Sequence, residues 1–151
     1  MDELIYEKAK NTAFNLLAIR ARSRRELESR LLSKFDAEIT AEVIHTLESL
    51  SYLNDEDFAL QLIESLAKRG YGKRVIDAKL YEKGISSDIR RLLLSKIDNG
   101  LDSAMQALSK KYRNAEFDRS KAYAYLARRG FSSEVCRRAI TKWGETSDED
   151  N

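Results

Sequence analysis

The sequence contains one histidine, His45, and one cysteine, Cys136, which are the side chains that most readily act as a base and a nucleophile near neutral pH. Enzyme sites bring several ionisable groups together, but these two are 91 residues apart and each lies within an apolar helical pattern. We expect His45 on a helix surface or at the edge of a core, and Cys136 as a small buried side chain. No spacing typical of metal ligands occurs. The sequence therefore predicts a protein that is not an enzyme, with no catalytic residue, cofactor or metal.

A glycine-rich segment at residues 70–73, Gly-Tyr-Gly-Lys, resembles a fragment of a phosphate-binding loop. Such a loop follows a strand and carries Ser or Thr after its lysine, and both features are missing here. The segment is better explained as the end of one helix followed by the start of the next.

Pairs of basic residues are the stronger candidates for function. We take six of these residues as the candidate surface for a protein partner or for DNA: Lys73, Arg74, Arg128, Arg129, Arg137 and Arg138. Each cation at a helix C-terminus has a plainer explanation, because it complements the helix dipole by roughly 0.3 to 1 kcal/mol. Some aromatic side chains are also able to stack on bases, although most aromatics at helical spacing belong to a core: Tyr71, Tyr81, Tyr112, Tyr123, Tyr125 and Phe131.

The charge is unevenly distributed although the net charge is only +2. Residues 1–53 hold 8 Lys and Arg against 9 Asp and Glu, and residues 54–98 hold 9 against 8. Residues 99–143 hold 10 against 4, and residues 144–151 hold none against 4. The third segment is therefore a local basic field that suits a phosphate backbone or an acidic protein surface. The alternative is that these charges simply solvate helix surfaces.

The elements that position these residues are three copies of one pattern, a helix, a turn and a second helix. Residues 72–97 contain the pattern, residues 23–47 repeat it upstream, and residues 118–143 repeat it downstream. The apolar positions of the three copies coincide at offsets of 49 or 50 and then 46 residues, at steps of four within the second helix. The aligned triplets are Leu27, Ile76 and Ala122; Leu31, Leu80 and Leu126; Phe35, Ile85 and Phe131; Ile39, Ile89 and Val135; Val43, Leu93 and Ala139; and Leu47, Ile97 and Trp143.

Capping residues define the turns. Gly84 and Gly130 are expected to end their helices in the left-handed conformation, with Ser86 and Ser132 capping the next helices. The first copy has no such glycine before Phe35, which predicts a different turn. Upstream, residues 4–21 form an amphipathic helix, and residues 23–26, Ser-Arg-Arg-Glu, form a capping box.

We therefore predict an all-α protein of three tandem three-helix repeats that form an elongated, curved array. The expected units are residues 1–53, residues 54–98 and the basic residues 99–143, with a loop at 114–116 and a disordered acidic tail at 144–151. One cysteine excludes an internal disulfide, and no run of 18 apolar residues occurs. We expect a cytoplasmic monomer that does not associate with membranes.

Several segments resemble the RecX family, the bacterial regulators of the RecA recombinase. They are Leu-Asn-Asp-Glu-Asp-Phe-Ala at 53–59, Lys-Arg-Gly-Tyr-Gly at 68–72, Lys-Gly-Ile at 83–85 and Arg-Gly-Phe at 129–131. The resemblance covers most of residues 18–143. Local departures are the missing glycine before Phe35, Asn54 where aspartate is usual, and Lys73 where proline is frequent.

The resemblance implies a modulator without catalytic activity that lies in the groove of a RecA filament on DNA. There it hinders strand exchange, ATP turnover and co-protease activity. Two alternatives stay open: a stand-alone DNA-binding protein that uses its helix pairs to read DNA, and a helical scaffold for an unrelated protein. The nearly balanced charge of the first two units argues against a dedicated duplex reader.

Overall fold

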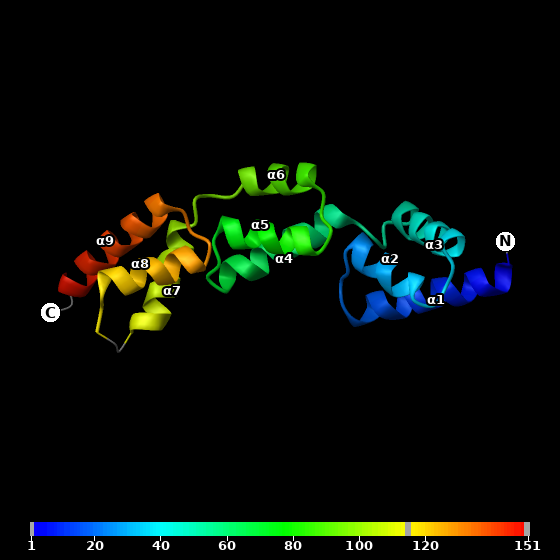
Figure 1. Ribbon diagram of the computed structural model, residues 1–151, viewed down its shortest axis with the longest axis horizontal. Coiled ribbons are helices and arrows are strands. Elements are labelled where there is room, and N and C mark those ends of the chain that lie inside the picture. The colour runs from blue at the N-terminus through cyan, green and yellow to red at the C-terminus, as the bar shows by residue number, and fades with distance from the viewer. Residues whose placement is uncertain (1, 114–115, 150–151) are drawn as a thin grey trace.

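The computed structural model describes residues 2–113 and 116–149, and within them the chain forms nine α-helices and no strand. The helices follow one another in three groups of three along the long axis, with the first helix and the last helix at opposite ends of a curved body (Figure 1). The predicted all-α array is confirmed. The helices are α1 (Glu3–Ile19), α2 (Arg24–Leu32), α3 (Ala37–Ser49), α4 (Asp55–Lys68), α5 (Lys73–Glu82), α6 (Ser87–Ser95), α7 (Leu101–Tyr112), α8 (Arg119–Arg128) and α9 (Ser133–Glu149).

Short polar side chains start most of these helices by accepting a hydrogen bond from an otherwise unpaired backbone amide. The predicted capping box of α2 is present, because the Ser23 hydroxyl accepts from the Glu26 amide while the Glu26 carboxylate accepts from the Ser23 amide. Other helices are capped by one side chain each: Asp2, Asp36, Asn54, Ser86 and Asp118.

The turns within the second and third repeats are built on glycine, as predicted. Gly84 has φ +80° and Gly130 has φ +100°, backbone conformations that side chains with a Cβ rarely adopt. In each turn the amide after the glycine donates to a carbonyl near the end of the preceding helix, Ile85 to Leu80 at 3.1 Å and Phe131 to Leu126 at 3.2 Å.

The turn of the first repeat differs, as the missing glycine predicts. It has no residue with positive φ, and the Phe35 amide donates to the Leu31 carbonyl at 2.8 Å. The absence of a left-handed residue thus changes the shape of this turn without preventing it.

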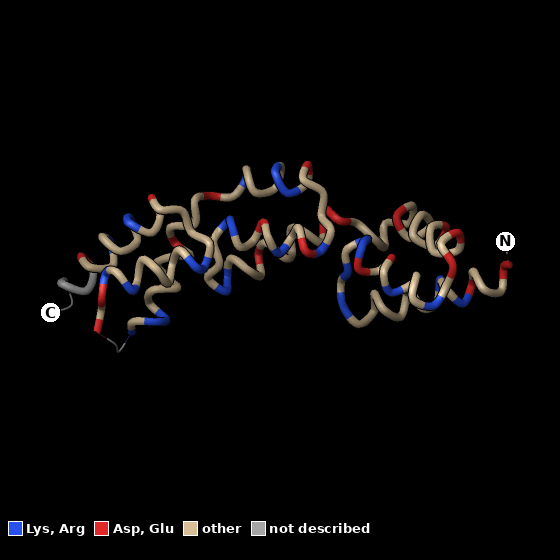
Figure 2. Tube along the Cα trace, in the orientation of Figure 1, with Lys and Arg blue, Asp and Glu red and all other residues tan. Residues whose placement is uncertain are grey.

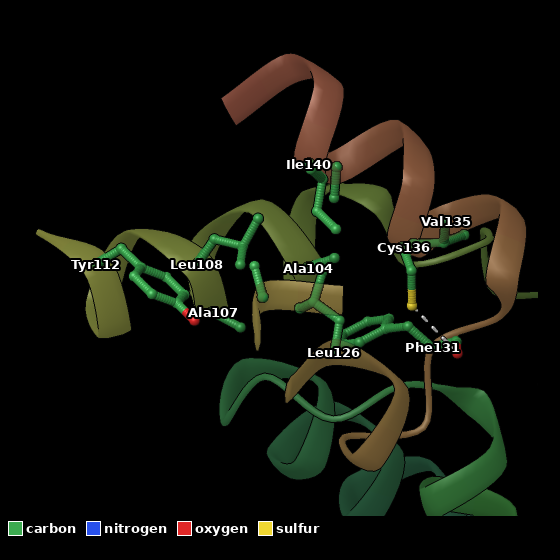
Figure 3. Close-up of a cluster of buried hydrophobic side chains, with 11 residues drawn as sticks. Ala104, Ala107, Leu108, Tyr112, Leu126, Phe131, Val135, Cys136 and Ile140 are labelled. Carbon is green, nitrogen blue, oxygen red and sulfur yellow. Dashed lines mark hydrogen bonds between the residues drawn. The ribbon is translucent and has the colours of Figure 1, made fainter. Parts of the chain in front are cut away.

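Each repeat has its own hydrophobic core, and none of the three clusters crosses between repeats. Leu31, Leu80 and Leu126, which the sequence aligns, are completely buried at the three centres. Figure 3 shows the third cluster, in which side chains from α7, α8 and α9 point toward one another. Of the other aligned positions, Phe35, Ile89, Ile97 and Trp143 are only partly buried. The predicted inward faces are otherwise correct.

The C-terminal end differs from the prediction. The sequence predicts a disordered tail at residues 144–151, but α9 continues to Glu149. Once a packed helix has formed, each further residue adds a hydrogen bond at little cost, and no proline interrupts this stretch. Residues 150 and 151, and residues 114 and 115 of the predicted loop, lie outside the described residues.

The proposed unit boundaries at 53/54 and 98/99 fall between helices, because α4 starts at Asp55 and α7 at Leu101. We keep residues 1–53, 54–98 and 99–143 as proposed units and call them units one, two and three. Within the described ranges, no helix is both long and apolar enough to cross a membrane.

Replacing Leu80 by Ala should lower the free energy of unfolding by roughly 2 to 5 kcal/mol, because it leaves a cavity at the centre of unit two. The matched control is Leu92→Ala on α6, where the side chain is 47% exposed and the expected loss is about 0.5 kcal/mol or less. Urea unfolding followed by circular dichroism measures both. Equal losses for the two variants would mean that the core face of unit two is wrongly assigned.

Candidate partner-binding surface

The six candidate cations occupy two regions of the array. Lys73 and Arg74 begin α5 of unit two, and Arg128 and Arg129 end α8 of unit three, so the structure brings these four together where the two units meet. Arg137 and Arg138 lie further along unit three, on α9. Figure 2 marks the positions of Lys and Arg along the chain.

Units two and three are joined end to end through their backbones. The Gly72 amide donates to the Arg129 carbonyl at 2.8 Å, and the Arg74 amide donates to the Gly130 carbonyl at 3.2 Å. Amides at the start of α5 thereby pair with carbonyls at the end of α8. The partial positive charge at one helix end faces the partial negative charge at the other, which is favourable. This approach requires glycine on both sides, because a Cβ on Gly72 would lie 2.5 Å from the Gly130 carbonyl carbon and one on Gly130 would lie 2.6 Å from the Val75 nitrogen.

Two of the candidate arginines hold this joint together. Arg129 donates from its guanidinium to the Gly70 carbonyl at 3.1 Å and also to the Arg69 carbonyl, and it lies 4.2 Å from the centroid of the Tyr71 ring. Arg74 donates to the Ala127 carbonyl at 2.7 Å. These arginines therefore fix the relative position of units two and three, whatever else they bind.

Units one and two are joined at the equivalent positions, here through a side chain. Ser23 aligns with Gly72 and Lys83 aligns with Arg129, and the Ser23 hydroxyl donates to the Lys83 carbonyl at 2.6 Å. Gly84 lies so close to α2 that a Cβ there would be 2.3 Å from Cδ of Arg25. In both joints, the residue that caps the second helix of one unit meets the carbonyl at the end of the second helix of the next.

A charged cluster supports the first joint. The Glu26 carboxylate accepts from Lys83 at 3.1 Å and from Arg20 at 2.9 Å, in addition to the Ser23 amide at 3.2 Å. Burial by itself would raise the pKa of Glu26, but these three hydrogen bonds outweigh it and lower the pKa to about 2. Glu26 therefore stays ionised and ties Lys83 of unit two to unit one.

The other four candidates are free to meet a partner. Arg128, Arg137 and Arg138 are exposed and make no hydrogen bond or ion pair with the described residues. Lys73 is half-buried and lines a hollow of about 350 Å³ beside Phe131. Sequence reasoning could not separate these four from the two joint arginines, because the contacts of Arg74 and Arg129 span 53 to 60 residues.

The surface of unit three also contains a hollow that sequence reasoning missed. Its volume is about 550 Å³, and α8 and α9 line it with Arg119, Ser120, Tyr123, Arg137, Ile140 and Thr141. Arg119 has no basic neighbour in sequence, so a search for basic pairs overlooks it. The four-residue spacing of Arg137 and Thr141 was the available signal, since it places both on one face of a helix.

The structure does not bring His45 and Cys136 together. His45 is exposed on α3 of unit one. Cys136 is fully buried in unit three, where its thiol points to the Phe131 carbonyl at 3.7 Å (Figure 3) and burial raises its pKa. Among the described residues, no group of three or more His, Cys, Asp or Glu is placed to hold a metal ion. Cys136 is the small buried side chain that the sequence predicts.

Comparison with known proteins gives consistent matches along the chain. Family profiles described as the first, second and third three-helix domains of RecX match residues 9–47, 54–93 and 98–140. A regulatory protein RecX of Clostridioides difficile is 31% identical over 94% of this chain and 71% of the relative, and one of Corynebacterium efficiens is 34% identical over 88% and 72%. A crystal structure of RecX from Lactobacillus salivarius superposes with a TM-score of 0.80 at 24% identity, over 92% of this chain and 96% of the other. This last match shows the shared fold.

Gly72→Ala should open the joint between units two and three, because the new methyl group would overlap the Gly130 carbonyl. Helix content should change little, since each unit keeps its own core, whereas the radius of gyration from small-angle X-ray scattering should change. Gly144→Ala is the control, because its methyl would meet only a flexible arginine end, Nη2 of Arg119 at 3.3 Å. Scattering that does not distinguish the two variants would contradict the role of Gly72.

Glu26→Gln should make the free energy of unfolding less dependent on pH between about pH 7 and pH 3. The carboxylate has a pKa of about 2 when folded and roughly 4.3 when unfolded, so its contribution is present above about pH 4.3 and is lost as the pH falls toward 2. We expect the variant to be less stable than the parent at pH 7 and to approach it at pH 3, as measured by denaturant unfolding. Glu42→Gln, which removes an exposed carboxylate of α3, should behave like the parent at both pH values.

Proposed function

The chain belongs to the RecX family of regulatory proteins, and we propose that it is a non-enzymatic modulator that binds RecA filaments on DNA. Bound there, it inhibits the recombinase, ATPase and co-protease activities of RecA. This function would place the protein in the cytoplasm, in DNA repair and recombination and in the SOS response.

The observation that carries the proposal is the repetition of one joint. At both joints the residue before the second helix of one unit, Ser23 or Gly72, donates to the carbonyl at the end of the second helix of the next unit, so the three units follow one another with related geometry along one body. Such a body gains most from a partner that is itself repetitive, since each contact after the first is effectively intramolecular. A filament meets this condition, whereas a single globular partner does not.

The charges of the array fit a filament that combines protein with DNA. Units one and two are nearly balanced, and the free cations Lys73, Arg128, Arg137 and Arg138 lie toward or within unit three. Balanced units suit contact with a protein surface, and a basic unit suits acidic side chains or phosphates. Direct binding of DNA by unit three is therefore part of the proposal, and a monomer is sufficient for it.

The bound protein inhibits the activities of RecA because it occupies the filament. A body fixed along several subunits hinders the movements and the access that a filament needs for strand exchange, ATP turnover and co-protease activity. No bond has to be made or broken by the bound protein, which agrees with the separation of His45 from Cys136.

The protein should sediment with RecA assembled on single-stranded DNA in preference to free RecA or bare DNA, and the DNA-stimulated ATPase of RecA should fall as the protein is titrated in. Both are measured with purified components. If equimolar protein leaves the ATPase and strand exchange unchanged and sediments with filaments no better than with DNA, the stand-alone DNA-binding alternative takes the place of this proposal.

A charge-reversed variant refines that experiment. Lys73→Glu combined with Arg128→Glu should weaken filament binding about tenfold, or about 1.4 kcal/mol, with unchanged helix content. Arg74 and Arg129 are left in place because reversing them would disturb the joint. Lys8→Glu combined with Arg30→Glu, two exposed positions of unit one, makes the same change in net charge and should weaken binding less.

A further inference from the structure

The hollow between α8 and α9 has an apolar floor and a cationic rim. Tyr123 and Ile140 form the floor and pack on the core of unit three beneath it. Arg119 and Arg137 lie on the rim with the hydroxyl groups of Ser120 and Thr141. None of the described residues that line this hollow is acidic, so its chemistry suits a ligand that is flat and apolar in one part and anionic in another.

The rim cations are available for such a ligand. Arg119 and Arg137 make no hydrogen bond, ion pair or ring contact with the described residues. The guanidinium of Arg119 reaches across from α8 to α9, where its Nη2 atom lies 3.3 Å from the position that a Cβ on Gly144 would take. Two unpaired guanidinium groups therefore flank one hollow of about 550 Å³.

The basic surface continues beyond this hollow along α9. A second hollow of about 340 Å³ shares Arg137 and Thr141 with the first and is lined in addition by Arg138, Lys142 and Glu145. Arg138 makes no contact with the described residues that would neutralise it. The cations thus form a path across two adjacent hollows, and the carboxylate of Glu145 makes its far end unfavourable for an anion.

We propose that these two hollows bind a single-stranded polynucleotide, with one base on Tyr123 and Ile140 and the adjoining phosphates on Arg119, Arg137 and Arg138. An aromatic floor between guanidinium groups is the arrangement that binds unstacked bases and a phosphate backbone together. The bases of a duplex are stacked and paired, so they cannot reach such a floor. An acidic protein surface would satisfy the arginines but leave the floor empty.

This subsite rests on the proposed function, in which the protein acts on filaments formed on DNA, but it is tested without RecA. A failure of the subsite therefore leaves the RecA experiments above to be judged separately. The assay measures fluorescence anisotropy of a labelled oligothymidylate titrated with the full chain at several salt concentrations.

Arg119→Gln combined with Arg137→Gln should weaken this binding about tenfold or more. Loss of two phosphate contacts should also reduce the slope of log K against log salt by about 1.4, at roughly 0.7 for each contact with a single strand. The matched control is Arg30→Gln combined with Arg91→Gln, which removes two exposed arginines from units one and two. If the two double variants bind alike, the subsite is wrong.

The floor is tested by a pair of substitutions at Tyr123. Tyr123→Phe keeps the ring and should bind like the parent, whereas Tyr123→Leu keeps an apolar side chain without the ring and should weaken binding about fivefold or more. Circular dichroism of both variants checks that unit three remains folded, and a Tyr123→Leu protein that is folded and binds normally overturns the base contact.

Two further ligands, a DNA duplex and an acidic peptide, test whether the hollows prefer a single strand to other classes of partner. The parent should bind the labelled single strand more tightly than a duplex of equal length, and equal or tighter binding of the duplex overturns the assignment. A labelled polyglutamate peptide should bind weakly and respond little to the arginine changes. If the arginine changes reduce binding of polyglutamate but not of oligothymidylate, the hollows bind an acidic protein segment instead.

Discussion

The hydrogen-bonded joint between successive units sets the shape of the whole array. Each of the three units buries its own apolar residues, so nothing in the cores determines how the units are placed relative to one another. That placement is determined by a few hydrogen bonds between the start of one helix and the end of another, at Ser23 with Lys83 and at Gly72 with Arg129. Backbone groups approach this closely at the second joint only because Gly72 and Gly130 have no Cβ, and at the first joint Gly84 leaves room for the side chain of Arg25. Small polar joints between independent cores produce an elongated array instead of a single globule.

The same joints divide the basic residues into two sets. Arg74, Lys83 and Arg129 carry charge, but their hydrogen bonds go to carbonyls and a carboxylate of the neighbouring unit. Their first effect is therefore on the shape of the array. Arg119, Arg128, Arg137 and Arg138 make no such contacts with the described residues, and they are the arginines to which we assign partner binding. A loss of function after mutation of a joint arginine would thus report on geometry as well as on binding, whereas mutation of the second set reports on binding alone.

The two proposals place different demands on the molecule. Binding along a filament depends on the whole array, because several units must meet several subunits at once. Binding of a single strand depends only on unit three, where the rim arginines and Tyr123 belong to one pair of helices. A protein that combines the two would contact protein over most of its length and nucleic acid at one end, which accords with balanced charge in units one and two and excess positive charge in unit three.

The helices, their caps and their inward faces are predictable from the sequence, since they follow from local signals. A capping box, two glycine turns and apolar residues at steps of four place Leu31, Leu80 and Leu126 at the unit centres without knowledge of the tertiary structure. The sequence also indicates the family through short segments within the repeats. The roles of the cations are visible only in three dimensions. Arg129 donates to the Gly70 carbonyl, 59 residues away, and Arg119 of α8 lines the same hollow as Arg137 of α9. The helical end of α9 was missed for a related reason. An acidic composition predicts disorder for an isolated segment, but here the segment continues a helix that the core of unit three already holds in place.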